Sequence, residues 1–167
     1  MTDLLGWTVE AHLPGRPDRV VVRARRDDGP PVVLKATVPG ASWTARARLR
    51  AEGRLLDVVR GPGVVELLDV VDRGRRTALV LDFVPLHHPA PAPGSIVERL
   101  ARLGVAHRAL RPEHVLMTAE GEPVLCGFGS AVRYTSRRSR SSSVSRRTTR
   151  RASPSFTNTT GGRGTLL

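Results

Sequence analysis

Cysteine, aromatic residues and long apolar runs are all scarce in this chain of 167 residues. The only cysteine is Cys126, which excludes an intrachain disulfide, so nothing in the sequence argues for an oxidising compartment. No apolar run approaches the roughly 20 residues that span a bilayer. Residues 1–7 lack the basic region and apolar core of a signal peptide. We therefore expect a cytoplasmic protein without a membrane segment.

Acidic residues are absent from the end of the sequence. All 15 lie before Arg133, whereas nine of the 27 basic residues lie in the range 133–167. Of the formal net charge of +12, only +3 therefore belongs to the first 132 residues. A net charge of +3 over the first 132 residues gives no strong electrostatic argument that they bind nucleic acid, so such binding is expected through the tail only.

The range 133–167 is rich in arginine, serine and threonine, and we predict that it is a disordered tail, because it offers too little apolar surface to bury. Two interpretations stay open. The tail can be a basic arm that binds RNA or DNA phosphates, although its only aromatic residues, Tyr134 and Phe156, offer little base stacking. Alternatively, the reading frame shifts near Val132 and the tail is an out-of-frame product of a gene remnant. The abrupt change of composition favours the second interpretation.

Short apolar or alternating runs in the first half of the chain predict a β-sheet. They occupy residues 8–13, 20–25, 32–36, 64–71 and 77–81, with turn clusters rich in glycine, proline and charged residues between them. Between the third and fourth runs, Ser42 is a candidate N-cap for a helix that continues to about Val59. The apolar stripe of this helix is Ala45, Leu49, Leu55, Leu56 and Val59. The sequence thus predicts an α+β fold with a five-stranded antiparallel sheet and one helix.

The pattern is weaker after Val84. Residues 85–94 are rich in proline, alanine and histidine and are predicted to be a linker. Residues 95–103 predict only a short helix. Residues 115–117 and 123–126 predict a hairpin whose turn is formed by residues 120–122.

The sequence of residues 107–116, HRALRPEHVL, followed by CGFG at 126–129, resembles the catalytic loop and the metal-binding turn of a protein kinase. In that family the loop reads H-R-D-x-K-P-x-N and the turn reads D-F-G. Ala109 stands here at the position of the catalytic Asp. His114 and Gly127 stand at the positions of the Asn and Asp that hold Mg²⁺. The resemblance therefore implies a site that has lost its catalytic residue and both metal ligands.

Further landmarks of the kinase family follow in the right order. Residues 32–35 (V-V-L-K) resemble the strand whose lysine contacts nucleotide phosphates. The helix over 45–56 resembles the one that supplies a partner Glu, which makes Glu52 the implied partner of Lys35. Residues 61–65 resemble the turn into the fourth strand, and 77–84 the fifth strand and hinge. His107 and Phe128 are retained, and the resemblance implies a structural role for both.

Lys35 is also the only lysine in the chain. All other basic residues are arginine, whose planar guanidinium cannot imitate a compact ammonium on a flexible stem. The single lysine could fall on a strand by chance, but its V-V-L-K context favours a functional reason. This observation supports the resemblance independently of the loop motifs.

The resemblance covers residues 8–132 and identifies the chain as resembling a truncated, catalytically degenerate pseudokinase of the bacterial serine/threonine protein kinase type. It implies a small lobe with hinge over 1–84, a Pro-rich linker over 85–94, a partial large lobe over 95–132 and the tail over 133–167. No A-P-E segment appears, and the helices that normally precede the catalytic loop look cut down. Apolar surface left bare in this way implies an unknown protein partner and a regulatory or binding role.

The implied nucleotide-binding residues are Lys35, Glu52, Asp82 and Val84, the last two at the hinge. The phosphate-covering G-x-G-x-x-G-x-V loop is missing, since only one glycine, flanked by two prolines, lies in residues 14–17. Weak ATP binding and no ATP binding both stay open, and Mg²⁺ is not expected because imidazole is a poor ligand for it. A residual ATP-dependent kinase that uses other residues is the alternative to an inactive protein.

Overall fold

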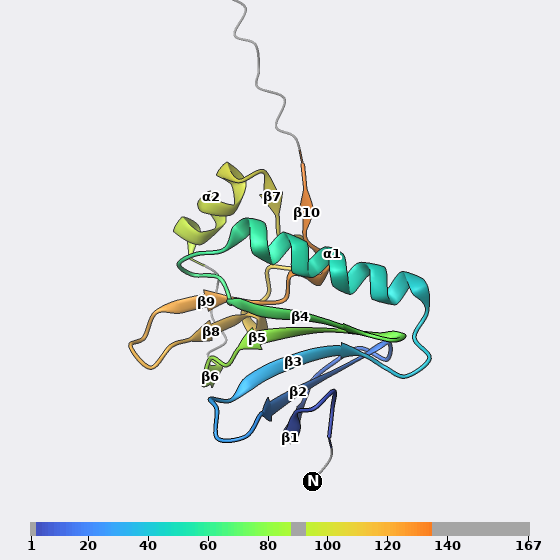
Figure 1. The fold of residues 1–167 in the computed structure, drawn as a ribbon. Helices are drawn as coiled ribbons and strands as arrows, with labels where there is room; N and C mark the ends of the chain where they lie inside the picture. The colour runs from blue at the N-terminus through green and yellow to red at the C-terminus, as the bar shows by residue number, and fades with distance from the viewer. Residues whose placement is uncertain (1–2, 88–92, 135–167) are drawn as a thin grey trace, which may run out of the picture. The chain divides into compact units, whose positions relative to one another are not determined.

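The computed structural model describes residues 3–87 and 93–134. One antiparallel sheet has the strand order β1-β2-β3-β5-β4 (Figure 1). Its strands are β1 (Thr8–Leu13), β2 (Arg19–Arg25), β3 (Val32–Thr37), β4 (Leu67–Arg73) and β5 (Arg76–Asp82). Together with the long helix α1 (Trp43–Val59), the sheet confirms the predicted α+β fold class, which is the arrangement of a kinase small lobe.

The fourth strand begins later than the sequence predicts. Residues 64 and 65 were expected to belong to it, but they pair with the hairpin of the second half instead. The Val65 N–H donates to the Leu125 carbonyl at 3.0 Å, and Val64 forms an isolated bridge with the same residue. β-branched residues favour extended backbone without specifying a pairing partner, so the sequence alone could not assign these two residues to a sheet.

The helix α1 lies across one face of the sheet (Figure 1). Ser42 caps it as predicted, since its hydroxyl accepts a hydrogen bond from the Ala45 N–H at 3.1 Å. All five residues of the predicted apolar stripe are buried, and Glu52 and Gly53 are buried among them. At Gly53 the helix comes so close that an added Cβ would lie 2.9 Å from a Leu79 methyl group on β5.

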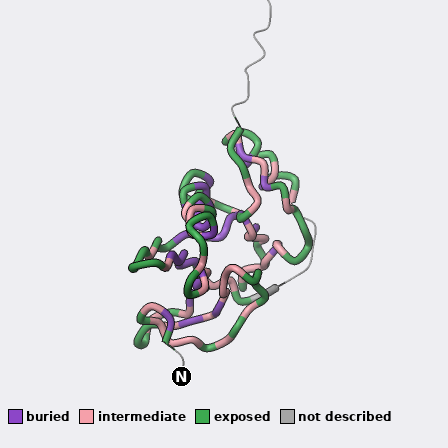
Figure 2. Tube along the Cα trace, turned by 90° about the vertical axis from the view of Figure 1, so that its right-hand side faces the viewer, coloured by how far each residue is buried: buried purple, intermediate pink, exposed green. Residues whose placement is uncertain are grey.

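The alternation of side chains along the strands separates two apolar cores. Leu79 and Leu81 face α1 and belong to the larger core, which continues to Phe128 in the second half. Leu34 and Val80 face the opposite side, where a smaller core includes Leu4 of the N-terminal segment. Buried and half-buried positions alternate along much of β2 and β3, whereas residues 77–81 of β5 are all buried because both faces of this strand are covered. Turns are mostly exposed (Figure 2).

The second half contains short elements only. Its helix α2 (Gly94–Arg102) precedes β7 (Val105–Ala106), the 3-10 turn η1 (Pro112–His114), the hairpin β8 (Val115–Met117) and β9 (Pro123–Leu125), and the 3-10 turn η2 (Phe128–Ser130). Three short strands, β6 (Leu86–His87), β7 and β10 (Val132–Arg133), fall where none was predicted. β6 pairs with β8 inside the range predicted as a linker, and β10 pairs with β7. Each strand has two residues and depends on a partner far away in sequence, so no local pattern indicates it.

Regular pairing therefore continues past Val132, where the tail was predicted to begin, and the Tyr134 N–H donates to the Gly104 carbonyl at 2.8 Å. The predictions for residues 88–92 of the linker and 135–167 of the tail lie outside the described residues. In the two described ranges, no helix is both long enough and apolar enough to cross a membrane.

Candidate functional site

Lys35 and Glu52 form a buried ion pair between β3 and α1. The Lys35 ammonium donates to Glu52 Oε1 at 2.5 Å, and the exposed fractions of the two side chains are only 14% and 3%. Strand alternation directs Lys35 to the face of the sheet covered by α1, since its neighbour Leu34 belongs to the opposite core. The pair implied by the kinase resemblance is thus present in the structure.

Arg19 adds a second cation to the same carboxylate. Its Nη1 lies 3.5 Å from Glu52 Oε2, and its side chain is 9% exposed. The Arg19 Nε also donates to Asp18 Oδ1 at 3.2 Å, so the guanidinium links two carboxylates. Burial of an unpaired charge is costly, and this network satisfies Glu52 on both oxygens without any bound ligand.

The turn that resembles D-F-G packs directly against this cluster. A Cβ added to Gly129 would lie 3.2 Å from Glu52 Oε2 and 3.3 Å from Arg19 Nη1. The structure therefore brings the Lys35–Glu52 pair and the 127–129 turn together, although 77 residues separate Glu52 from Gly129 in the sequence. The sequence analysis predicted the Lys35–Glu52 pair, but it did not predict this contact with the turn.

His114 and Gly127, the two positions of the missing metal ligands, are in contact. Gly127 has φ +81°, and a Cβ there would lie 2.7 Å from two carbons of the His114 ring. The His114 ring is fixed by its Nδ1–H, which donates to the Ala109 carbonyl at 2.7 Å. The imidazole thus occupies the space that a side chain at position 127 would need.

Ala109 offers a methyl group and backbone atoms only. Its carbonyl is engaged by His114, so the position provides no side-chain group that could accept a proton. In residues 3–87 and 93–134, no cluster of three or more His, Cys, Asp or Glu side chains could hold a metal ion.

His107 and Phe128 lie in the core behind this turn, as the resemblance implies. Both side chains are buried, and their rings make an edge contact with centroids 4.6 Å apart. The His107 Nε2–H donates to the Cys126 carbonyl at 2.9 Å, and Nδ1 has no hydrogen-bond partner among the described residues. Burial lowers the pKa of His107 from its ordinary value. Burial likewise raises the pKa of the Cys126 thiol to about 11, so the only cysteine of the chain is held as a neutral thiol.

Asp82 and Val84 lie at the other end of this surface. Asp82 pairs with Val32 at the start of β3, three residues from Lys35, which is roughly 10 Å along a strand. The Asp82 side chain is exposed and Val84 is half-buried. Within the described part of the chain, no hydrogen bond or ion pair joins Asp82 or Val84 to the charged cluster of Lys35, Glu52 and Arg19. The predicted role of Asp82 and Val84 at an adenine site stays a prediction.

Arg19 is the site residue that the sequence reasoning missed. The missing glycine loop was noted, but the residues that follow it were not examined for a charge that could reach Glu52. Residues 20–22 are all valine, so the spacing of G-x-G-x-x-G-x-V does not single out Arg19. The second cationic partner of Glu52 is therefore known from the structure and not from a sequence motif.

Comparisons with known proteins agree with the motifs. No protein-family model matches the chain. It is 26% identical over 137 residues to the mitosis inducer protein kinase cdr2 of Schizosaccharomyces pombe, and 34% identical over 104 residues to the serine/threonine-protein kinase pkn2 of Myxococcus xanthus. These matches cover 70% and 50% of this chain, but the chain spans only 18% and 12% of the two relatives. The chain is thus similar to protein kinases over part of its length, and it has the sheet and helix of a kinase small lobe.

Proposed function

We propose that the chain is a catalytically inactive, protein kinase-like protein that acts by binding and not by phosphoryl transfer. The observation that supports this most is the contact between His114 and Gly127. A carboxylate at position 127 and the His114 ring cannot both fit without movement of one of them. The glycine at position 127 is therefore coupled to the histidine at position 114, because the His114 ring needs the space that the kinase Asp would fill.

Phosphoryl transfer in kinases needs positioned Mg²⁺ to offset phosphate charge and an Asp to accept the proton of the substrate hydroxyl. Loss of a general base alone costs on the order of 10² to 10⁴ in rate. Ala109 removes that group here, while His114 and Gly127 remove both metal ligands. Because all three losses act on the same transition state, we infer that transfer is lost.

Nucleotide contact is proposed to be weak and independent of Mg²⁺. Lys35 remains on the sheet and could meet a phosphate group, but Glu52 already engages it. Arg19 occupies the other side of the same carboxylate. A phosphate would have to compete with these bonds, and no glycine-rich backbone is present to cradle it.

A thermal-shift measurement tests this proposal. The melting temperature is measured with ATP at millimolar concentration, once with Mg²⁺ and once with a chelator. We expect the two shifts to be equal and small, and to disappear in Lys35→Met. A shift that requires Mg²⁺ would contradict the proposal, because it would show a metal site that the residues present do not provide.

A binding role is supported by the apolar side chains exposed in the second half. Leu103, Leu110 and Tyr134 are 39%, 48% and 43% exposed. Leu103 and Tyr134 lie near each other, since the Tyr134 hydroxyl donates to the Ala101 carbonyl at 3.3 Å and its N–H donates to the Gly104 carbonyl. Neighbouring exposed apolar groups are typical of surfaces that other proteins cover. We propose that a partner protein covers part of this surface.

A further inference from the structure

A groove of about 750 Å³ runs between α1 and the segment 128–133. The wall formed by α1 includes Arg48, Ala51, Leu55 and Val58. These residues follow the spacing i, i+3, i+7, i+10 and therefore share one face of the helix. We call this feature, lined by residues 48–58 of α1 and 128–133, the α1 groove. The outer part of the α1 groove is lined by residues that belong neither to the Lys35–Glu52 ion pair nor to the catalytic loop.

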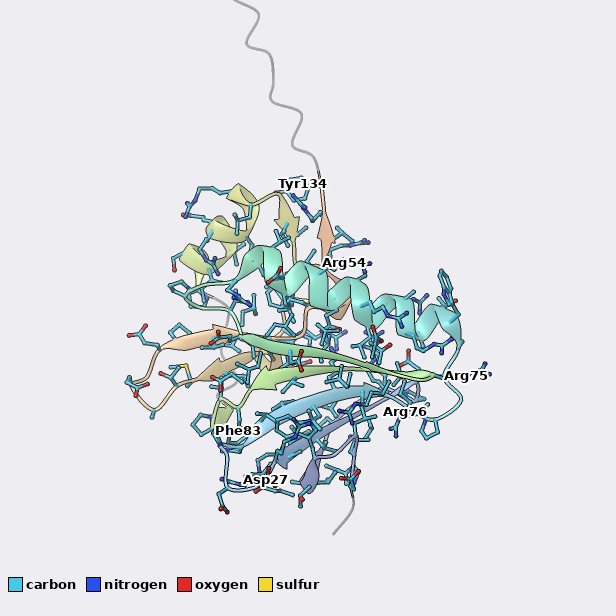
Figure 3. All side chains as sticks on the ribbon, viewed as in Figure 1. Asp27, Arg54, Arg75, Arg76, Phe83 and Tyr134 are labelled. Carbon is cyan, nitrogen blue, oxygen red and sulfur yellow. The ribbon has the colours of Figure 1, made fainter. Side chains whose placement is uncertain are left out.

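The outer part of the α1 groove carries positive charge that nothing in the described chain neutralises. Arg48, Arg54 and Arg133 line it, and all three are exposed. Within residues 3–87 and 93–134, none of them takes part in an ion pair or a side-chain hydrogen bond. The exposed acid of the wall, Asp57, lies 3.5 Å from Arg60. Figure 3 shows Arg54 on the side of α1 that faces away from the sheet.

The acidic residue at the inner end of the α1 groove, Glu52, does not neutralise the positive charge of the outer part. Glu52 lines the groove, but its side chain is 3% exposed and is engaged by Lys35 and Arg19. An incoming group therefore meets the three free guanidinium groups first. Guanidinium groups pair well with carboxylates because their planar forks match the two carboxylate oxygens.

Apolar atoms complete the lining between the arginines. Val58 and Val132 are 38% and 37% exposed, and they come from opposite walls of the α1 groove. Ala51 is also exposed, while Leu55 and Phe128 form the buried base. A ligand that combines carboxylates with small apolar side chains would match both parts of this lining.

The helix that forms one wall is fixed before any ligand arrives. Glu52 ties its middle to β3, and Arg50 makes hydrogen bonds of 2.9 Å to both carboxylate oxygens of Asp72 on β4. Near its end, the Arg99 guanidinium donates to the Val59 carbonyl at 3.0 Å. A wall held in this way loses little conformational freedom on binding, which favours affinity.

We propose that the α1 groove binds an extended acidic peptide segment of a partner protein. Its carboxylates pair with Arg48, Arg54 and Arg133, and a small apolar side chain lies between Val58 and Val132. This inference rests on the binding role proposed above and names the chemistry of the partner. An acidic peptide is favoured over single-stranded nucleic acid because the lining offers no exposed aromatic ring for base stacking.

The first test is fluorescence anisotropy with the full chain and a short fluorescent peptide of alternating glutamate and leucine. The groove variant combines Arg48→Glu, Arg54→Glu and Arg133→Glu. The control variant combines Arg16→Glu, Arg73→Glu and Arg75→Glu. These three exposed arginines lie outside the α1 groove, and their side chains make no ion pair with any residue in 3–87 and 93–134. Both variants lose the same charge and keep the same tail.

We expect the groove variant to weaken binding on the order of tenfold relative to the control, since it removes three ion pairs that are each weakened by solvent screening. Equal weakening in both variants would overturn the proposal, because it would show that only net charge matters. The proposal would also be overturned if the peptide did not bind to the wild-type chain but an RNA oligonucleotide did, and if the groove variant weakened the binding of that RNA.

A second measurement on the wild-type chain does not depend on the folding of any variant. The same peptide, carrying a photoreactive phenylalanine analogue, is cross-linked and the attachment sites are found by mass spectrometry. We expect them in residues 48–58 and 128–133. Attachment in 135–167 alone would assign the binding to the tail and overturn the groove. Neither result bears on the proposal that the kinase-like site is inactive, because the Mg²⁺ effect and phosphoryl transfer are measured without the peptide.

Discussion

The ring of His114 lies in the space that a side chain at position 127 would fill, so that a Cβ on Gly127 would come within 2.7 Å of two ring carbons. His114 is held there by its hydrogen bond to the Ala109 carbonyl. The three positions that would carry catalysis in a kinase are thus linked in one local arrangement. Reversal of a single substitution is expected to disturb that arrangement before it restores any chemistry.

Gly127→Asp is expected to destabilise the fold by about 1–3 kcal/mol, the usual cost of inserting atoms into filled space. Combined with His114→Asn, the loss should be smaller by on the order of 1 kcal/mol, because the smaller amide removes the overlap. Chemical denaturation of the two single variants and the double variant measures this coupling.

The control for backbone strain is Gly40→Asp. Gly40 has φ +74°, similar to the φ +81° of Gly127, but an added Cβ meets nothing within 4 Å. Aspartate tolerates the left-handed region better than most residues, so the loss at Gly40 should be clearly smaller. If Gly40→Asp costs as much as Gly127→Asp, or if the double variant shows no coupling, the contact with His114 is not the cause.

Glu52→Gln should be among the most destabilising changes of a polar residue in the chain. It leaves two half-buried cations, Lys35 and Arg19, without the buried carboxylate that they share. Breaking a buried pair costs about 3–5 kcal/mol, and partial exposure of the cations places the loss towards the lower end of this range. The free energy of unfolding in denaturant measures the effect. Glu10→Gln is the matched control, since Glu10 also pairs with two arginines but at the surface, where solvent screens the interaction. Similar losses in both variants would show that the burial of Glu52 adds nothing.

His107 should make stability depend on pH below neutrality. Its pKa is lowered in the fold by burial, so in this range the unfolded chain binds a proton that the folded chain does not. The free energy of unfolding should therefore fall as the pH falls from about 7 through the ordinary histidine value near 6.5 towards the lower folded pKa. His107→Gln should flatten this slope. His12→Gln, which alters an exposed histidine, is the control for the loss of one histidine. An unchanged slope in His107→Gln would contradict the assignment.

Cys126 provides a chemical test of how closed the site is. With its pKa raised to about 11 from an ordinary value near 9, the thiolate fraction at mildly alkaline pH falls about a hundredfold. Reaction with iodoacetamide should be slower by at least that factor in the folded chain than in denaturant. Because the chain has no other cysteine, mass spectrometry of the intact protein follows this reaction alone. Equal rates in both states would show that the thiol is accessible and ionised.

Local patterns predicted much of the fold, and they did so where burial follows a regular period. The stripe of α1 follows helical spacing, and Ser42 caps the helix as expected. Glu52 is buried beside this stripe, but no local rule identifies which cation a buried carboxylate meets. The partnership with Lys35 was predicted from the kinase resemblance, and the partnership with Arg19 was not predicted.

Pairings between distant short segments could not be read from the sequence. Residues 64 and 65 look like any β-branched run, yet they join the Leu125 strand and not β4. β6 and β10 have two residues each, too few to show a period. The fit of His114 against Gly127 is also invisible in the sequence, because it depends on the ring orientation set by the Ala109 carbonyl.

Transfer of labelled phosphate from ATP tests the central claim most directly. The full chain is incubated with γ-labelled ATP and Mg²⁺ or Mn²⁺, alone and with casein as a general acceptor, beside the variant Lys35→Met. The account predicts that incorporation into either protein equals that of Lys35→Met, which is background. Incorporation that is above background and is lost in Lys35→Met would contradict it, and would show an active kinase that uses residues other than those at positions 109, 114 and 127.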